Sequence, residues 1–440
     1  MKRFFQTIKN MFSIEDLRVR ILNTIGFLII FRLGSFVVLP GVDPDKLTSP
    51  GGIFDFLDIF LGGAFNRASI FALGIMPYIS ASIVIQLLTV AVPYFQKMQK
   101  EGDSGRKKMT QITRVLTIAI TAAQSLSYIA VTIPAEAILV ENRFFFTITS
   151  VVLITTGTMF CMWLGEKITD KGIGNGISML IMIGIIAGFP QALIQEAAAK
   201  GMQGALLFIL EILALFFVVM TVVMLTQAVR RIPVQYAKQV VGNKVYGGQR
   251  QYIPLKVNAS GVMPIIFAQA LMFIPGMVAG FWRDSSDIAN TIGNTFNDFT
   301  SWQYNVVFGL LIIVFTFFYT AITVNPNDIA DNLKRNGGFI PGIKPGKQTS
   351  EFIDNILTRI TFPGSFFLAI VAILPAIASM AGVTRGFSYF YGGTSLLIMV
   401  GVILDTLQQI ESYLLMRHYE GLMKSGRIKG RSQNIAVAQG

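Results

Sequence analysis

The chain has 440 residues, of which 53% are hydrophobic and only 14% are charged. This composition is typical of a polytopic membrane protein and excludes a large water-soluble core. A single cysteine, Cys161, excludes intramolecular disulfides, and a single histidine, His418, argues against a histidine-based metal or catalytic centre. We therefore expect no enzyme and no cofactor, and no cleavable signal in the polar, basic N-terminus.

Long stretches without charge predict ten membrane-spanning helices, because about 20 apolar residues are enough to cross a bilayer. Arg32 interrupts the first of them. We predict an all-α polytopic membrane protein whose spans divide into five plus five, residues 1–200 and 201–440, as in transporters built from repeats. The predicted spans are residues 21–40, 69–93, 115–133, 144–165, 174–195, 205–229, 257–280, 306–324, 362–382 and 392–416.

A shorter hydrophobic piece, residues 53–65, lies between two Gly-Gly pairs before the second span. It carries Asp55 and Asp58 on one helical face and is too short to cross a bilayer. Such a half-helix either re-enters a cavity lined by protein or water, or lies flat on the membrane surface. The residues alone leave both interpretations open.

Lys and Arg residues are concentrated on one side of the predicted membrane. The N-terminus, the connections after the even-numbered spans and the C-terminal tail (residues 417–440) hold 29 of the 36 Lys and Arg residues, and the other connections hold six. By the positive-inside rule, both termini lie in the cytoplasm. Topology alone accounts for this one-sided net charge of +12, and a docking face for RNA, anionic lipid or an acidic protein is the functional alternative.

Two cytoplasmic connections, residues 230–256 and 325–359, are longer than topology requires. The first has β-type residues on both sides of Gly242-Asn243, which predicts a hairpin. In the second, a short predicted helix is followed by two Pro-Gly turns that present Lys344 at a tip. Connections of this length are usually functional or disordered, and the turn residues favour rigid docking loops.

Two carboxylates, Asp405 and Glu211, fall within predicted spans, where ionisable residues are commonly functional. Both lie near a helix end and can reach water, and Arg32 can pair with either one or extend to the headgroups. Three functions stay open on the residues alone. They are a secondary transporter coupled through Asp405 or Glu211, a channel blocked by residues 53–65, and a scaffold that docks a partner on its long loops.

Long motifs in the expected order resemble landmarks of the SecY family, the central subunits of protein-export channels. The resemblance covers about residues 14–431. It implies two five-helix halves in a clamshell, hinged on the external side between spans 5 and 6, with an hourglass pore that residues 53–65 plug. The motifs are FRLGSF (31–36), RASIFALGIMPYISASIVIQLLTV (67–90), WLGEKITDKGIGNGIS (163–178), YAKQVVGNKVYGGQRQYIPLKVNASGVMPIIFA (236–268), NPNDIADNLKRNGGFIPGIKPGKQT (325–349) and GGTSLLIMVGVILD (392–405).

The resemblance also implies roles for single residues. Asp55 and Asp58 are expected on the solvated face of the plug, and a narrow apolar pore ring resists leakage by dewetting. A modest polar seam at the lateral gate, between spans 2 and 7 with 3 and 8, lets two helices part at low cost. The pore ring is Ile75, Ile79, Ile181, Ile266, Ile274 and Ile398. The plug includes Ile53, Asp55, Phe56, Asp58, Phe60, Gly62 and Gly63. The lateral gate includes Ser80, Gln86 and Ile274.

The family's docking sites for the SecA motor ATPase and the ribosome imply candidates on the two long loops, namely Arg250, Lys256, Lys334, Arg335 and Lys344. The family usually has arginine at the loop tip, and Lys344 keeps the charge without the bidentate guanidinium. The implied function is passage of unfolded secretory polypeptides, with lateral release of hydrophobic segments into membrane lipid. Implied partners are SecE-like and SecG-like subunits and signal-bearing polypeptides, in the bacterial plasma (inner) membrane.

Overall fold

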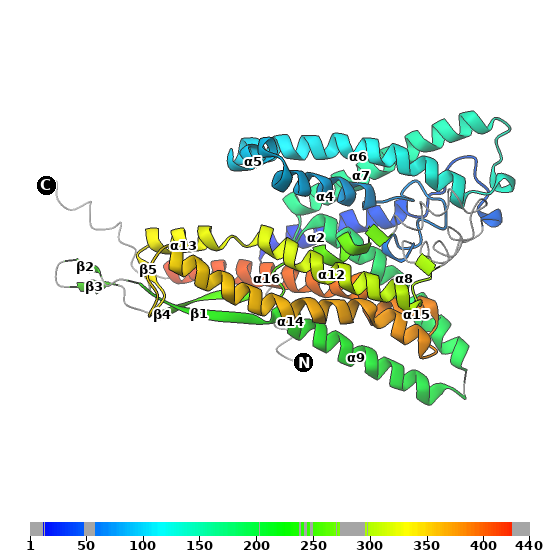
Figure 1. Cartoon of the computed structure of the whole chain (residues 1–440). Coiled ribbons are helices and arrows are strands. Elements are labelled where there is room, and N and C mark those ends of the chain that lie inside the picture. The colour runs from blue at the N-terminus through cyan, green and yellow to red at the C-terminus, as the bar shows by residue number, and fades with distance from the viewer. Residues whose placement is uncertain are drawn as a thin grey trace.

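Long helices run roughly side by side and meet a small group of strands at one end of the molecule (Figure 1). The computed structural model describes residues 12, 14–47, 58–201, 203–236, 239–241, 244–246, 250–269, 271–272, 295–296 and 298–424. The long helices are α2 (Glu15–Gly34), α4 (Met76–Ala91), α6 (Asp103–Thr132), α7 (Arg143–Lys171), α8 (Gly176–Lys200), α9 (Ala205–Gln227), α12 (Trp302–Thr323), α14 (Lys347–Met380) and α16 (Gly393–Lys424). The shorter ones are η1 (Pro44–Lys46), α5 (Pro93–Lys100), η2 (Ala135–Ala137), α13 (Pro326–Arg335), α15 (Arg385–Ser388) and η3 (Tyr389–Tyr391).

The prediction of ten spans is met in part. Within the described residues, seven helices are long and apolar enough to cross a membrane, and α4 with α5, bent by 103°, would make an eighth. The helix α2 fails the same test because every long window in it contains several charges, including Arg18, Arg20 and Arg32. The predicted seventh span, residues 257–280, lies partly outside the described residues. The fold is therefore mostly helical and polytopic.

The second predicted span starts later than expected, which corrects the predicted range 69–93. Residues 69–75 form a bridge and turns, and α4 begins only at Met76. Gly74 has a φ of 50°, a left-handed conformation that glycine adopts readily and that interrupts a helix. Pro77 then occupies the first turn of α4, where its missing N–H costs nothing.

The two long connections fold together into one sheet. Strand β1 (Val229–Tyr236) pairs antiparallel with β4 (Arg250–Lys256), and β5 (Gly338–Phe339) from the second connection pairs with the other edge of β1. Beyond them, β2 (Gln239–Val241) and β3 (Lys244–Tyr246) pair on either side of residues 242–243, which confirms the predicted hairpin. Buried side chains of β1, β4, α13 and α14 form a common core.

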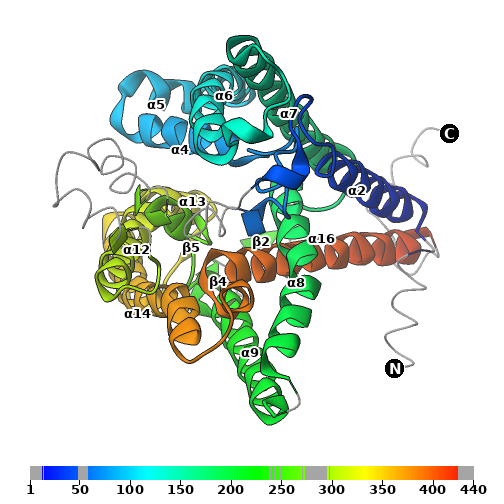
Figure 2. The ribbon, with the colours of Figure 1, turned by 90° about the vertical axis from the view of Figure 1, so that its right-hand side faces the viewer.

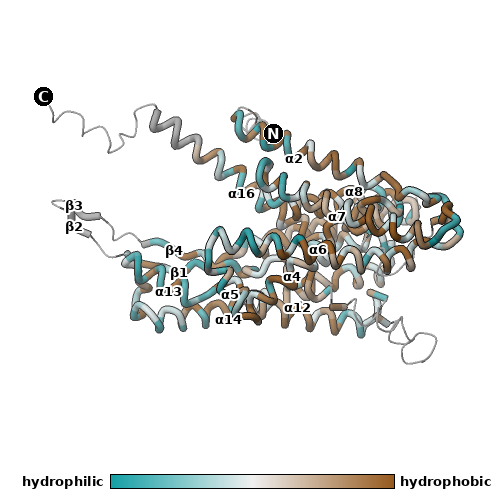
Figure 3. The backbone as a smooth tube through the Cα atoms, turned by 90° about the horizontal axis from the view of Figure 1, so that it is seen from above, coloured by the Kyte–Doolittle hydropathy of each residue, from teal (hydrophilic) through white to brown (hydrophobic). Residues whose placement is uncertain are grey.

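Helices α4, α6 and α7 lie on one side of the molecule and α12 and α14 on the other, as Figures 1 and 2 show. The helix α8 contacts α2 and α7 and also α9 and α16, and α16 in turn contacts α14, so α8 and α16 together link the two sides. Hydrophobic residues dominate the middle of the bundle, whereas hydrophilic residues collect toward the end that carries β1, β4 and α13 (Figure 3). The candidate site lies within the apolar part of the bundle.

Candidate functional site

Three of the predicted pore residues converge on one narrow cavity. Ile75 directly precedes α4, Ile79 lies one turn later, and Ile181 belongs to α8. These side chains line a small cavity with Phe60 and Leu61 from the segment before α4. Every side chain in the lining is apolar, and the remaining ones are Phe31, Met76 and Leu180.

The other predicted pore residues lie nearby or outside the described residues. Ile266 and Ile398 pack in one apolar cluster with Phe60 and Ile181. Ile274 lies outside the described residues. Phe60 and Ile181 belong both to this cluster and to the cavity lining, so they link the two groups that hold the five described ring residues.

The predicted plug is described only from residue 58 onward, so Ile53, Asp55 and Phe56 lie outside the described residues. Residues 58–60 are helical, and residues 61–68 form turns. Phe60 is buried at 7% exposure. The segment therefore places an aromatic side chain at the cavity.

Asp58 is half-buried and is held by hydrogen bonds within its own segment, so its expected place on a solvated face of the plug stays a prediction. Its two carboxylate oxygens accept hydrogen bonds from the backbone N–H and the side-chain Nδ2 of Asn66, at 3.0 and 3.1 Å. The turns at Gly62 and Gly63, with φ of 63° and 84°, fold the chain back so that Asn66 reaches Asp58. Glycine is suited to both positions because a side chain there would be strained.

One hydrogen bond joins the two sides of the bundle at the predicted lateral gate. The Tyr319 hydroxyl of α12 donates to Gln86 Oε1 of α4 at 3.2 Å. Ser80 instead donates to the Met76 carbonyl of its own helix at 3.2 Å. The hydrogen bond between the helices thus joins Gln86 and Tyr319. The sequence reading missed Tyr319, although a lone tyrosine hydroxyl within an apolar span was a usable signal.

The predicted docking residues gather at the end with the sheet. Lys256 ends β4, and Lys334 and Arg335 form the last turn of α13. Their side chains and that of Lys344 are exposed. Arg250 begins β4, and its side chain is outside the described part. Because β5 joins β1, basic residues from two distant connections lie on one platform, which we define as β1, β4, β5 and α13.

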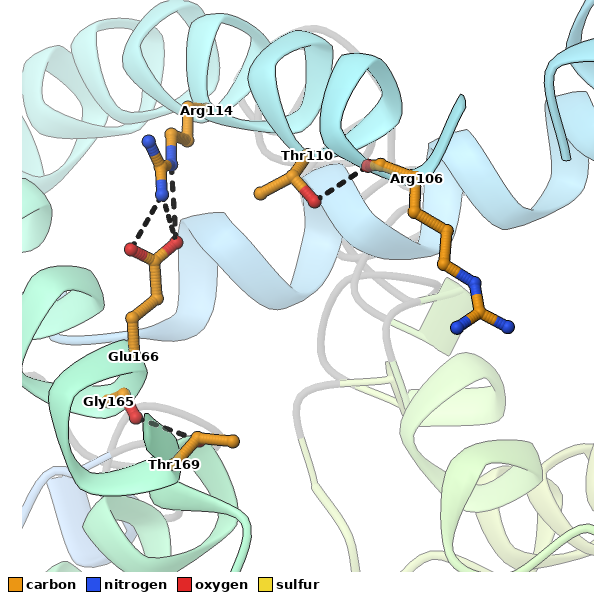
Figure 4. Close-up of polar contacts among 6 residues, drawn as sticks. All are labelled: Arg106, Thr110, Arg114, Gly165, Glu166 and Thr169. Atoms are coloured by element: carbon orange, nitrogen blue, oxygen red, sulfur yellow. Dashed lines mark hydrogen bonds and ion pairs between the residues drawn. The ribbon is translucent and has the colours of Figure 1, made fainter. Parts of the chain in front are cut away.

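An ion pair that the sequence reading did not single out joins α6 to α7 (Figure 4). Arg114 Nη2 lies 2.8 and 2.7 Å from the two carboxylate oxygens of Glu166, and its Nε lies 3.2 Å from one of them. Such bidentate contacts are strong and directional. The signal was present in the sequence, because the two opposite charges flank predicted spans 3 and 4 on the same side of the membrane. The pair joins α6 to α7.

A buried charge cluster joins α8 to α9 at the end far from the strands. Lys200 Nζ lies 3.6 Å from Glu196 and 2.9 Å from Glu211. Lys200 also donates to the Gly382 carbonyl at 2.8 Å, and Thr384 donates to Glu196 from both its backbone N–H and its hydroxyl. Glu196 is 0% exposed. The cluster ties two consecutive helices to the segment that leads into α15.

The intramembrane charges occupy different environments. Glu211 is held in the cluster just described, and Asp405 is exposed on α16. Arg32 contacts neither of them, so the pairing considered for it from the sequence is wrong. Its guanidinium donates instead to the Gly62 carbonyl at 2.5 Å. These contacts give no support to a coupling site shared by Arg32, Asp405 and Glu211.

Comparison with known sequences identifies close relatives over nearly the whole chain. The SecY family model matches residues 69–407. The protein translocase subunit SecY of Streptomyces scabiei is 43% identical, over 94% of this chain and 98% of its own. The corresponding subunit of Halalkalibacterium halodurans is 45% identical, over 96% of this chain and 100% of its own.

Solved structures share the fold. A protein-conducting channel aligns with a TM-score of 0.64 at 16% identity, over 90% of this chain and 92% of its own. A SecY whose plug domain stabilises the closed state of its channel and maintains a membrane seal aligns at 0.61 and 17% identity. Sec61 from a canine ribosome–channel complex aligns with a TM-score of 0.60 at 16% identity. Both alignments cover 90% of this chain and 92% of the other. By its family match and its relatives, this multi-pass membrane protein belongs to the SecY family of protein translocase subunits.

Proposed function

We propose that this chain forms the polypeptide-conducting pore of a bacterial Sec translocase in the plasma (inner) membrane. It passes unfolded secretory polypeptides across the membrane and releases hydrophobic segments sideways into lipid. The observation that carries the proposal is the convergence of Ile75, Ile79 and Ile181 with Phe60 on one apolar cavity. Membership of the SecY family and the channel fold of its structural neighbours support it.

A narrow apolar constriction suits a polypeptide conduit for two reasons. It disfavours a continuous column of water, so ions do not leak when no substrate is present. It also offers no charged or hydrogen-bonding side chain that would hold a passing chain. In the closed state, Phe60 and Leu61 fill the space against Ile75 and Ile79, and an entering polypeptide displaces them.

Lateral release takes place where α4 meets α12. The Tyr319–Gln86 hydrogen bond contributes about 1 kcal/mol, which is small enough for the helices to part. A hydrophobic signal segment that moves into lipid gains roughly 25 cal/mol for each Å² of apolar surface removed from water. Burial of a typical signal segment therefore outweighs the loss of this contact. Ser80 and Ile274 belong to the same proposed gate.

The driving force comes from partners that dock on the platform, either the SecA motor or a translating ribosome. Exposed Lys256, Lys334, Arg335 and Lys344 favour an acidic or RNA-bearing partner. A structural neighbour, canine Sec61, is part of a ribosome–channel complex. The sequence contains no GxxxxGK[ST] phosphate loop, so we infer that the chain hydrolyses no nucleotide itself. SecE-like and SecG-like subunits complete the complex, and both termini face the cytoplasm.

Crosslinking to a stalled secretory chain tests the pore. Cys161 is replaced by serine, and single cysteines are placed at Ile75, Ile181, Ile266 or Ile398. The translocating polypeptide carries one cysteine of its own. Leu206→Cys on α9 and Ile370→Cys on α14, which are 83% and 57% exposed on the outside of the bundle, serve as controls.

Disulfides from all four positions, without disulfides from the two controls, would establish these residues as the polypeptide pore. If none of the four forms a disulfide while partners still bind the platform, the conduit is elsewhere. A docking scaffold or a solute transporter would then explain the protein better.

A further inference from the structure

We propose that Arg32 of α2 and Gly184 of α8 form a seat that holds residues 58–62 in the closed position. We call this pair the plug seat. The inference rests on the proposed function, because it takes Phe60 and Leu61 as the seal of the pore. Two contacts of different physical kinds carry it, a charged hydrogen bond from α2 and a close backbone approach to α8.

The first contact comes from Arg32. Its Nη1 donates to the Gly62 carbonyl at 2.5 Å, and the side chain is only half-buried. The guanidinium also lies over the ring of Phe36, with Cζ 4.9 Å from the ring centroid. Arg67, from the far side of the turns, lies over the same ring at 4.4 Å. Phe36 thus holds the Arg32 side chain in the orientation that reaches Gly62.

The second contact depends on the absence of a side chain at Gly184. A methyl group there would overlap the Phe60 carbonyl and lie 3.3 Å from the Gly62 nitrogen. From the other direction, a methyl group at Gly62 would lie 3.1 Å from the Gly184 Cα. The segment therefore rests with its backbone directly against the backbone of α8, which only two glycines permit.

The residues that follow the glycine turns, 65–70, form a base that is anchored separately. The Tyr128 hydroxyl of α6 donates to the Phe65 carbonyl at 2.6 Å. The backbone N–H of Leu39 donates to Ala68, and that of Ile70 donates to Val37, at 2.8 and 2.9 Å.

The two left-handed glycines, Gly62 and Gly63, lie between this anchored base and the seated residues 58–61. They are the natural hinge, because glycine crosses between backbone conformations at low cost. Opening then needs the loss of the plug seat and of the hydrogen bonds between Asp58 and Asn66, while the base stays in place.

The seat predicts that two unrelated substitutions have the same effect. Arg32→Met removes the hydrogen bond, and Gly184→Ala pushes the Phe60 carbonyl away. A hydrogen bond to a charged group, once lost, shifts the closed-to-open ratio by about tenfold or more. Arg32→Met should therefore raise the resting ion leak by about tenfold or more without any secretory substrate, and Gly184→Ala should raise the leak as well, through the steric overlap.

The measurement is ion flux through proteoliposomes that contain the complete channel complex. Gly188→Ala is the matched control for Gly184→Ala, because it lies one turn along α8 and an added methyl would meet only Phe390 at 3.9 Å. Arg18→Met, exposed on α2, is the control for Arg32→Met. Only variants that elute from size exclusion as the parent does are assayed, and the two independent substitutions guard against a single failure to fold.

A doubly widened ring, Ile75→Gly with Ile79→Gly, separates the two proposals. Leak from both seat variants with tight controls supports the plug seat. If the two seat variants do not leak while the widened ring does, the plug seat is wrong and the proposed pore still stands. The same holds if the Gly188→Ala control leaks as much as Gly184→Ala. If the widened ring is also tight, the ion path lies elsewhere, and the proposed function falls together with the seat.

Discussion

Lys344 owes its exposed position to the backbone on either side of it. Gly342 and Gly346 have φ of 86° and 105°, and the Ile343 N–H donates to the Ile340 carbonyl at 3.1 Å. Glycine at the third position of such a turn is what a type II geometry requires. The Pro-Gly pairs predicted these turns from the sequence, and the structure confirms them. The charge at the tip is therefore presented by a defined loop.

Reversing that charge should weaken coupling to a cytoplasmic motor. Lys344→Glu replaces attraction to an acidic surface by repulsion, so we expect SecA-driven transport to fall at least severalfold while the protein stays folded in the membrane. Import of a secretory precursor into inverted vesicles measures this. Lys347→Glu, exposed at the start of α14, is the control. Parental import rates in Lys344→Glu would refute a coupling role for the tip.

Tyr319→Phe tests the gate at the level of one hydroxyl. Without its hydrogen bond to Gln86, the closed gate loses about 1 kcal/mol, which shifts the open-to-closed ratio about fivefold. We expect less hydrophobic signal segments to be accepted, as scored by export of a graded series of signals. Tyr94→Phe, with Tyr94 65% exposed on α5, is the control. An unchanged hydrophobicity threshold would show that this bond does not restrain the gate.

The sequence assigns candidate site residues where a motif carries them, whereas contacts between residues far apart in the chain could not be predicted. The ring isoleucines were assigned through the family resemblance, because isoleucine in a membrane helix is otherwise ordinary packing. No local pattern indicates that Arg32 reaches Gly62 or that Tyr319 reaches Gln86. These partners are 30 and 233 residues apart in the chain, so only the packed structure brings them together.

At the scale of elements, the hairpin was predictable and the complete sheet was not. Turn chemistry around residues 242–243 is local, and β2 and β3 pair there. Strand β5 has only two residues and exists because β1 offers it an edge. Likewise, the start of α4 at Met76 depends on the turns before it, whereas hydropathy alone extends the span to residue 69.

The common core of the platform can be weakened from one position. Ile353 is 0% exposed and packs with side chains of β1, β4 and α13. Ile353→Ala should cost about 2–5 kcal/mol locally, through lost burial and a residual cavity. We expect faster cleavage of the cytoplasmic connections in limited proteolysis. Phe352→Ala, at a neighbouring position 36% exposed, should leave the cleavage rate near that of the parent. Equal rates in the two variants would contradict a shared core.

At the scale of the whole molecule, α8 and α16 are the helices through which the two sides meet. Near the strands, the Gly174 N–H before α8 donates to Gln409 of α16 at 2.9 Å. At the far end, the charge cluster of Glu196, Lys200 and Glu211 joins α8 to α9. Composition and charge predicted a polytopic bundle with a basic cytoplasmic side. They could not predict these junctions, which depend on how separate helices pack.

The charge cluster should matter to global stability. Lys200→Met leaves two buried carboxylates without their cation, which costs about 3–5 kcal/mol when a buried pair is broken. We expect a clear drop in Tm of the detergent-solubilised protein. Lys46→Met removes an exposed pair with Asp43 and should cost less than about 1 kcal/mol. A Tm for Lys200→Met equal to that of the Lys46→Met control would show that the cluster is energetically neutral.

The shared sheet has a mechanical consequence. Strand β1 continues directly from α9, α13 follows α12, and α14 follows β5 after the second connection, so the platform is joined to three helices on one side of the bundle. It has no such covalent link to α4 or α6. A force applied to the platform therefore reaches α9, α12 and α14 through the chain itself, and the Gln86–Tyr319 contact lies where α12 meets α4.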